Sequence, residues 1–162
     1  MTTIRETIQQ TKPFENLETE LYLGLVLLVQ RMNDNVYALL KEADLSQAQY
    51  NALRILRGAG AEGRACSEIA ERMIHRVPDV TRLLDRLELR GLISRRREES
   101  DRRVVRAWIT KTGLALIAPL DAPLATLHTK QLACLGEKRM KQFLQLTEAA
   151  LEALENCGKD AD

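Results

Sequence analysis

The sequence is poor in cysteine and histidine, the side chains that most often bind metals or form disulfides. Its 162 residues include three cysteines and two histidines. Cys66, Cys134 and Cys157 are far apart, odd in number and without a CxxC spacing, so neither a disulfide framework nor a zinc site is expected. We therefore predict a protein with no metal and no bound cofactor.

Long apolar runs and a leader segment are also missing. The longest apolar run, residues 21–29, has nine residues, about half of the roughly 20 that a helix needs to cross a bilayer. No charged stretch followed by an apolar core comes after the first methionine, which argues against a signal peptide. We expect a cytoplasmic protein that acts without a membrane.

Common catalytic motifs are absent as well. The sequence has no GxSxG, HExxH or P-loop pattern. Gly58, Gly60 and Gly63 match the GxGxxG spacing of dinucleotide sites, but they follow a capped helix where such a site needs a buried strand. We interpret these glycines as a flexible turn and predict that the protein is not an enzyme. An enzyme that binds NAD at this turn is an alternative.

The net charge of +1 excludes a uniformly basic protein, yet the basic residues are unevenly distributed. Residues 72–106 contain eleven arginines, no lysine and six acidic residues, a local net charge of +5. A guanidinium group can hold a phosphate or a guanine through two parallel hydrogen bonds, which an ammonium group cannot do. This segment favours a nucleic-acid-binding face. The alternative is a solvated helix with many ion pairs.

The spacing within this segment predicts a helix followed by a hairpin. Apolar residues from Val80 to Leu92 recur at helical intervals, and Arg82, Arg86 and Arg90 recur every four residues on the adjacent flank. Gly91 suits a left-handed residue that ends the helix. Apolar and basic residues then alternate with a period of two on both sides of the polar tip at residues 98–101. A basic helix leading into a basic hairpin indicates a winged helix-turn-helix, in which the helix enters the major groove.

The upstream residues complete this plan. Ser46 and Gln49 form a capping box that begins one helix, and residues 67–74 form a short second helix. After a turn at residues 75–77, Pro78 suits the first position of the basic helix. Asp79 either caps this helix, which is the commoner outcome, or faces a base edge.

The remaining helices point to a second subunit. Residues 15–43 form a helix that is apolar almost all round near residues 21–29, more than a small domain can cover. Pro119 and Pro123 should interrupt the helix after Thr110, and a last helix spans residues 137–155. We predict a mainly α fold with a small β-wing. It comprises an arm and dimerisation helix at 1–44, a winged helix-turn-helix domain at 45–110, and C-terminal dimerisation helices at 111–162 that complete the same dimer region as 16–44.

Four segments carry a family resemblance: LSQAQYNALRIL, SEIAERM, VTRLLDRLELRGLISR and DRRVVRAWIT, in this order and spacing. They resemble the MarR (multiple antibiotic resistance regulator) family of bacterial transcription factors, over about residues 16–156 and most strongly over residues 46–113. The resemblance implies a homodimer whose two winged domains bind a palindromic operator in double-stranded DNA. It also implies a repressor that a small ligand, such as an aromatic or phenolic compound, releases from the DNA.

The resemblance assigns roles to particular residues. For the recognition helix in the major groove it indicates Pro78, Asp79, Val80, Thr81, Arg82 and Arg86; for the wing, Arg95, Arg97, Arg102 and Arg103, with Asp101 bracing Arg103 by an ion pair or simply forming the turn. For the DNA backbone it indicates Ser67, His75 and Arg76, and for an effector crevice Thr81, Arg95, Trp108 and Met32. Trp108 lies on the outward face of its strand, where packing on a neighbouring helix is the favoured alternative to lining the crevice.

Two departures from the family pattern leave alternatives open. Ala65 and Cys66 stand where a Ser or Thr cap is common, and the first long helix lacks the reactive cysteine of peroxide-sensing members. A lone cysteine such as Cys66 is more often a small buried residue. A lowered pKa of its thiol near a helix N-terminus would instead support a cysteine-based redox-responsive regulator. A further alternative is a winged protein-interaction module that binds an acidic partner without specific DNA recognition.

Overall fold

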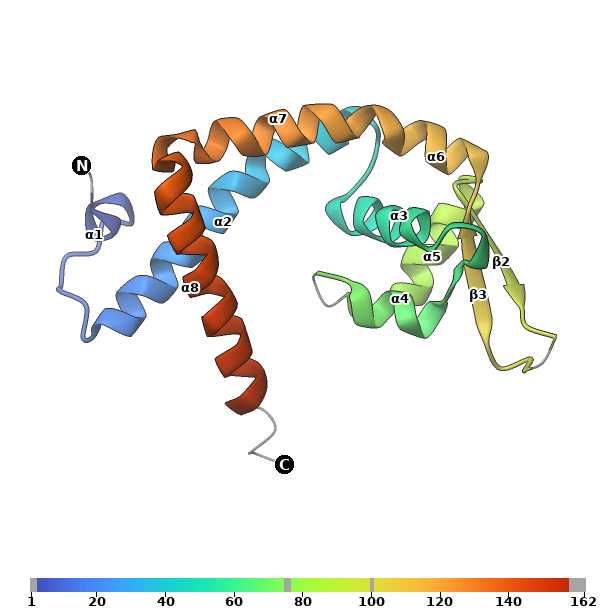
Figure 1. The fold of residues 1–162 in the computed structure, drawn as a ribbon, viewed down its shortest axis with the longest axis horizontal. Helices are drawn as coiled ribbons and strands as arrows, with labels where there is room; N and C mark the ends of the chain where they lie inside the picture. The colour runs from blue at the N-terminus through green and yellow to red at the C-terminus, as the bar shows by residue number, and fades with distance from the viewer. Residues whose placement is uncertain (1–2, 75–76, 100, 158–162) are drawn as a thin grey trace. The chain divides into compact units, whose positions relative to one another are not determined.

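The structure is a computed structural model that describes residues 3–74, 77–99 and 101–157 (Figure 1). The chain forms two compact units, residues 1–124 and residues 125–162. The α-helices are α1 (Ile4–Thr7), α2 (Leu17–Glu42), α3 (Gln47–Ala59), α4 (Cys66–Arg72), α5 (Val80–Leu89), α6 (Lys111–Ile117), α7 (Asp121–Leu132) and α8 (Gly136–Cys157). The strands are β1 (Arg64–Ala65), β2 (Ile93–Arg97) and β3 (Val105–Ile109), and short 3₁₀ turns lie at Gly60–Glu62, Ala118–Leu120 and Ala133–Leu135.

Helices α3, α4 and α5 and a three-stranded sheet form the winged helix-turn-helix that the sequence predicts. The sheet is antiparallel, with strand order β1-β3-β2. In its register Arg95 lies opposite Ala107, and Ser94 lies opposite Trp108. Because Ala107 is fully buried, this register turns Arg95 toward the inner face of the sheet and Trp108 toward the outer one.

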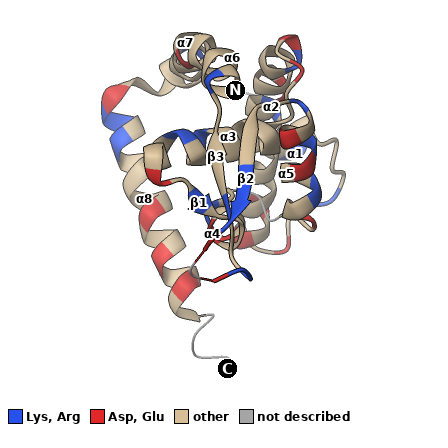
Figure 2. Cartoon of the chain, turned by 90° about the vertical axis from the view of Figure 1, so that its right-hand side faces the viewer, with Lys and Arg blue, Asp and Glu red and all other residues tan. Residues whose placement is uncertain are grey.

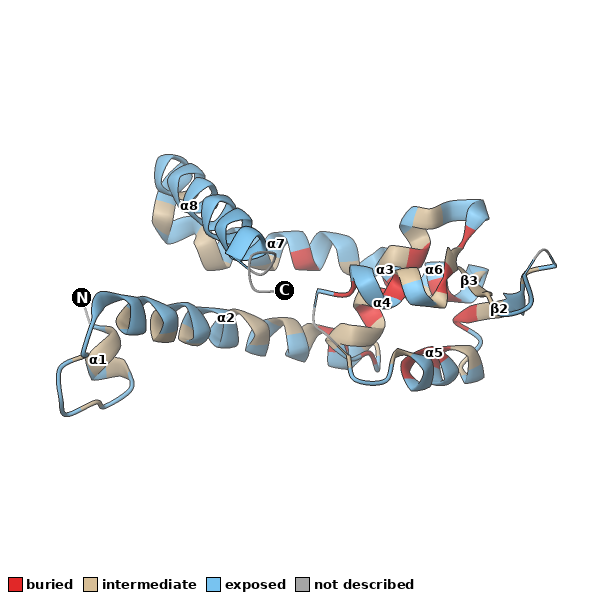
Figure 3. Cartoon of the chain, turned by 90° about the horizontal axis from the view of Figure 1, so that it is seen from below, coloured by how far each residue is buried: buried red, intermediate tan, exposed pale blue. Residues whose placement is uncertain are grey.

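The core of the first unit lies between these helices, as the red segments of Figure 3 show. Leu53, Leu56, Ile69, Leu84 and Leu87 have no exposed surface. Burying one such side chain contributes about 1.5–3 kcal/mol before the entropy of ordering is counted. The helical spacing of these residues therefore fixes which flank of α5 faces outward.

The ends of α3 and α5 follow local rules. Ser46 and Gln49 form the predicted capping box, with bonds of 3.2 and 2.9 Å. Gly91 has a φ of +68°, and its amide donates to the Glu88 carbonyl at 2.8 Å while the Leu92 amide donates to the Leu87 carbonyl at 3.0 Å. This pair of bonds is a Schellman motif, which confirms the predicted end of the basic helix.

The start of α5 differs from the prediction. Val80 is its first residue and Asp79 is the N-cap, so Pro78 precedes the cap and does not occupy the first helical position. The side chain of Asp79 accepts a bond from the Arg82 amide at 2.9 Å. That bond satisfies one of the free amide donors at the helix end. A proline side chain has no acceptor and could not do so.

Helices α2 and α8 carry large apolar side chains that remain exposed. In the 26-residue α2 only Leu40 is buried, and over residues 136–157 α8 has no buried residue. Exposed apolar residues are Leu17, Leu21, Tyr22, Leu25, Val26, Leu28, Val29 and Tyr37 in α2, and Phe143, Leu144, Leu146, Leu151 and Leu154 in α8. None of the helices in the described ranges is long and apolar enough to cross a bilayer.

The two prolines act as predicted in one case and differently in the other. Pro119 lies in the 3₁₀ turn that ends α6 and separates it from α7. Pro123 is the third residue of α7, within the first helical turn, where a missing amide costs no intrahelical bond. The first proline interrupts the helix and the second does not.

Candidate nucleic-acid interface

The outward flank of α5 is polar and basic. Thr81, Arg82 and Arg86 are exposed, whereas Leu83 and Leu87 on the opposite flank are buried. Figure 2 shows both charge signs on α5 and basic residues along β2. The helix therefore presents hydrogen-bond donors with reach toward base edges and phosphates.

Three other residues predicted for the recognition helix have different roles in the structure. Pro78 is exposed ahead of the cap, and Val80 is half-buried and packs against the core. Asp79 caps the helix and pairs with the Arg82 guanidinium at 3.0 Å. The Arg82 side chain is 80% exposed, and a pair this exposed holds its partners weakly. Arg82 can therefore exchange Asp79 for a DNA group at small cost.

The residues predicted to contact the DNA backbone are only partly described. Ser67 is exposed in the first turn of α4. The turn toward α5 is fixed on its α4 side by Asn51, whose side chain accepts from the Ile74 amide at 3.0 Å. His75 and Arg76 lie outside the described residues.

The wing tip is organised by Asp101. Its carboxylate accepts from the Arg103 amide at 2.9 Å, and its carbonyl accepts from the Val104 amide at 2.9 Å. Within the part of the chain that the structure describes, no ion pair joins Asp101 to the Arg103 guanidinium, so its role is that of the turn former. Arg97, Arg102 and Arg103 are exposed around it.

Arg95 is not available to DNA in the way the sequence predicted. Its guanidinium pairs with Glu88 at 2.7 Å and with Asp85 at 2.5 Å, and the Arg95 side chain is only 17% exposed. Hydrogen bonds that Arg95 donates to Glu88 and Asp85, opposed by burial, raise its pKa above the usual arginine value. Arg95 is a constitutively charged member of an internal ion-pair cluster.

The arginine-rich segment thus divides into two groups. Arg90, Arg95 and Arg106 pair with acidic residues of the chain, namely Asp44, Glu88 with Asp85, and Glu98. Within the described ranges, the exposed arginines without an ion pair are Arg72, Arg86, Arg96, Arg97, Arg102 and Arg103, and Arg82 has only its exposed pair with Asp79. The ion-pair interpretation holds for the first group, and the second keeps its charge for an anionic partner.

The glycine-rich turn is packed, not flexible as predicted. Gly63 has a φ of +63°, and a Cβ atom there would lie 2.5 Å from both the Ala107 carbonyl oxygen and the Trp108 Nε1 atom. The Trp108 indole donates to the Ala61 carbonyl at 3.0 Å. Gly63 allows the turn to approach β3 closely, a structural role that requires no bound nucleotide.

Two of the four residues predicted to line an effector crevice lie on opposite faces of the sheet. Arg95 and Trp108 lie on opposite faces of the hairpin, and Arg95 is occupied by two carboxylates. Thr81 is exposed on α5, and Met32 is half-buried in α2. Trp108 borders a hollow of about 220 Å³ with Ser94 and Arg96 on the outer face of the sheet.

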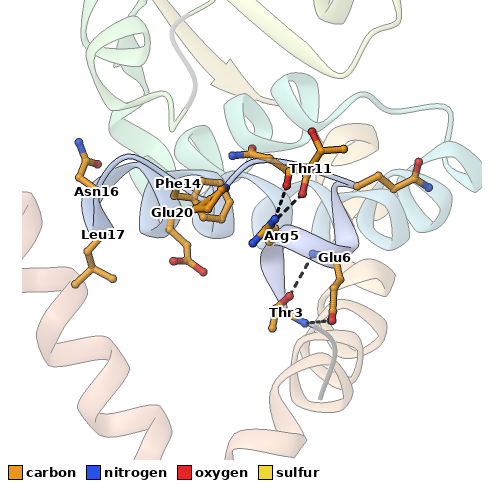
Figure 4. Close-up of a pocket in the computed structure, with 11 residues that line it drawn as sticks. Thr3, Arg5, Glu6, Thr11, Phe14, Asn16, Leu17 and Glu20 are labelled. Carbon is orange, nitrogen blue, oxygen red and sulfur yellow. Dashed lines mark hydrogen bonds between the residues drawn. The ribbon is translucent and has the colours of Figure 1, made fainter.

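A larger cavity, which the sequence did not indicate, lies between the N-terminal arm and the start of α2 (Figure 4). It has a volume of about 810 Å³, and Arg5, Glu6, Phe14 and Glu20 are among its lining residues. Arg5 donates to the carbonyl oxygens of Gln10 and Thr11, which folds the arm back on itself. Both signs of charge line the cavity, so it favours no single class of ligand.

Cys66 does not have the electrostatics of a redox sensor. It is the half-buried first residue of α4, and burial raises the pKa of its thiol above the usual value despite the nearby Arg95. A raised pKa lowers the thiolate fraction that reacts with oxidants. The half-buried side chain agrees with the commoner outcome for a lone cysteine, a small packed residue, and the raised pKa gives the redox alternative no support at this residue. Cys134 and Cys157 are exposed free thiols.

Comparisons with known proteins agree with this architecture. The model of the MarR family matches residues 45–105, from the start of α3 to the wing. The "HTH-type transcriptional repressor MdtR" of Bacillus subtilis (strain 168) is 29% identical over 144 residues, which cover 89% of this chain and 92% of that protein.

Solved structures extend the match to nearly the whole fold. A MarR transcription factor from Planctomyces limnophilus is 38% identical with a TM-score of 0.65, covering 85% of this chain and 99% of that one. The PcaV transcriptional regulator from Streptomyces coelicolor, solved with its natural ligand, is 22% identical with a TM-score of 0.69, covering 88% and 99%. The chain therefore belongs to the MarR family of transcription regulators.

Proposed function

We propose that the protein is a homodimeric, sequence-specific DNA-binding repressor that acts in the cytoplasm on a palindromic operator. The observation that carries this proposal is the set of exposed donors on α5 and the wing, represented by Thr81, Arg86, Arg102 and Arg103, whose side chains form no ion pair with any residue that the structure describes. A helix that reads base edges beside a basic wing is the geometry of winged DNA-binding domains. The repressor MdtR, which is similar over most of its length, supports the direction of regulation.

The homodimer is supported by the uncovered apolar side chains of α2 and α8. Leu21, Tyr22 and Val29 are 58%, 66% and 51% exposed, a concentration of apolar surface that usually marks a protein interface. We assign residues 1–44 and 111–162 to dimerisation and residues 45–110 to DNA binding. A dimer with a two-fold axis reads two inverted half-sites, hence the palindrome.

We further propose that a small aromatic or phenolic ligand releases the protein from DNA. The support is the family resemblance together with PcaV, a fold relative solved with its natural ligand. The effector residues suggested by the sequence need revision, because Arg95 is already paired with carboxylates. Thermal-shift screening with aromatic carboxylates and phenols tests this part: a shift in melting temperature together with release of DNA supports it, and binding without release contradicts it.

The DNA-binding proposal is tested by selecting duplexes from a random library and measuring affinity for the selected and scrambled sequences. We expect an enriched palindrome whose affinity falls by about three to five decades between 50 and 200 mM salt, because a dimer neutralises about 6–10 phosphates. The alternative, a winged module that binds an acidic protein, predicts no enrichment and equal, weak binding to both duplexes.

A further inference from the structure

A three-residue ion-pair cluster joins the recognition helix to the wing. Glu88 accepts three bonds from Arg95: from its amide at 2.9 Å, from Nε at 3.0 Å and from Nη2 at 2.7 Å. Asp85 accepts a further bond from Nη2 at 2.5 Å. Glu88 therefore holds both the main chain and the side chain of β2, so the contact restrains the strand itself.

The local structure explains how these groups meet. Asp85 and Glu88 are three residues apart on α5 and lie on the same side of the helix. The Schellman turn at Gly91 reverses the chain into β2, and the strand register places Arg95 on the face that looks toward α5. The Arg95 side chain is 17% exposed, and those of Asp85 and Glu88 are 53% and 38% exposed. The cluster is partly shielded from solvent, so its bonds are screened less than those of a surface pair.

The two acidic residues are costly for a DNA-binding helix unless they have another role. Each carboxylate on α5 repels phosphate groups and lowers the attraction that exposed Arg82 and Arg86 create. Pairing both with Arg95 neutralises part of that repulsion and ties α5 to the hairpin whose tip carries Arg103. These ion pairs explain why two carboxylates occur next to a DNA-binding surface.

We infer that the Asp85–Glu88–Arg95 cluster sets the position of the wing relative to α5, so that the wing tip and the recognition helix engage DNA together. This inference rests on the proposed function. Arg95 is then a positioning residue that acts through the hairpin and does not contact DNA. Its loss uncouples the wing from the recognition helix and leaves the contacts of α5 in place.

The first test uses the sign of a charge change, with the selected operator duplex and the full-length dimer. Glu88→Gln removes a negative charge near DNA, so electrostatics alone predicts tighter binding. The cluster predicts the opposite, a loss of about tenfold, because Arg95 loses its main partner. Glu99→Gln is the matched control: Glu99 is exposed near the wing tip with no ion pair among the described residues, and its removal should leave affinity equal or slightly higher.

The second test asks which DNA contacts depend on Arg95. We expect Arg103→Ala to weaken binding about tenfold in the wild-type protein and less than about twofold in an Arg95→Ala background, because the wing is already displaced. Arg82→Ala should cost the same in both backgrounds. A residue that only supported the overall fold would reduce the effects of both arginines, so this difference identifies positioning of the wing.

The outcomes distinguish failure of this inference from failure of the proposed function. Tighter binding by Glu88→Gln, or additive effects of Arg95→Ala and Arg103→Ala, would overturn the inference while leaving the DNA-binding proposal intact. Absence of any selected duplex for the wild-type protein would instead remove the proposed function. Circular dichroism checks folding. If Glu88→Gln is unfolded, Asp85→Asn takes its place, because Asp85 is the more exposed of the two acidic residues. A loss of operator affinity is again expected, and a gain in affinity would contradict the inference.

Discussion

At the scale of single residues, the wing tip separates side chains that contact a partner from those that shape the loop. Arg103 uses only its amide to hold the tip, because that amide donates to Asp101 at 2.9 Å. Its guanidinium is exposed and makes no ion pair in the described part of the chain. The side chain is therefore free for DNA while the main chain maintains the turn.

We predict that Arg103→Ala weakens binding to all duplexes with little change in melting temperature. The substitution keeps the amide that Asp101 needs and removes one cationic contact, so the slope of log affinity against log salt should fall by about one. Fluorescence anisotropy over a salt series and a thermal melt measure the two quantities. An Arg103→Ala protein that unfolds would show that the residue belongs to the scaffold.

Thr81 should behave differently, because it lies on the flank of α5 that faces outward. Thr81→Ala is expected to cost about 1–3 kcal/mol on the selected operator and much less on scrambled DNA, which reduces sequence preference. Equal losses on both duplexes would place Thr81 on the DNA backbone. Competition binding with single-base operator variants distinguishes these results.

At the scale of elements, the glycine-rich turn shows how a close approach fixes a local structure. Gly63→Ala should destabilise the protein by about 1–3 kcal/mol, because its φ is positive and the new methyl would meet main-chain and indole atoms at 2.5 Å. The chain has one tryptophan, so a shift in Trp108 fluorescence reports the displaced contact directly. Gly58→Ala is the control, since a Cβ at Gly58 meets nothing within 4 Å. Equal effects of the two variants would contradict this explanation.

The junction of α3 and α7 contains a pair whose strength depends on pH. The Arg57 guanidinium donates to the Asp121 carboxylate at 2.8 and 3.0 Å and thereby holds the pKa of that carboxyl below its usual value. A depressed carboxyl pKa contributes stability above the unfolded pKa of about 3.9, and this contribution disappears as the pH falls through the folded pKa. We predict that Asp121→Asn lowers the melting temperature at pH 7 and that the difference from wild type shrinks as the pH falls below the unfolded value and through the lowered pKa of Asp121. A constant difference across this range would assign the effect to packing.

The sequence predicted the ends of helices correctly where the atoms that determine them are neighbours in the chain. The capping box at Ser46 and the left-handed Gly91 involve groups within a few residues, so composition and spacing were sufficient. Arg95 was assigned to DNA because its partners lie on another element, and its spacing in β2 carries no information about Glu88. Cys66 is a similar case: the sequence left a lowered pKa and a small buried side chain open, and the burial that raises the pKa of its thiol depends on packing.

At the scale of the whole molecule, α2 and α8 each expose apolar side chains in the single chain, which favours the proposed dimer. Leu25 and Val29 are 40% and 51% exposed, one helical turn apart on α2, and with Tyr22 and Tyr37 they border an apolar hollow of about 550 Å³. Sequence periodicity could predict that this surface needs a cover. It could not say how two copies pair, because that geometry depends on residues from both subunits.

We predict that Val29→Asp produces a monomer that binds the operator at least about 100-fold more weakly. The carboxylate would be buried without a partner in the dimer, and a monomer loses the effective concentration with which the second half-site is bound. Sedimentation velocity gives the oligomeric state and anisotropy gives the affinity. Asn35→Asp is the matched control, since it adds the same charge to an exposed polar position of the same helix and should leave both unchanged. A monomeric wild type, or a monomeric Val29→Asp with undiminished affinity, would mean that each winged domain binds DNA alone and that the palindrome has no structural basis in this protein.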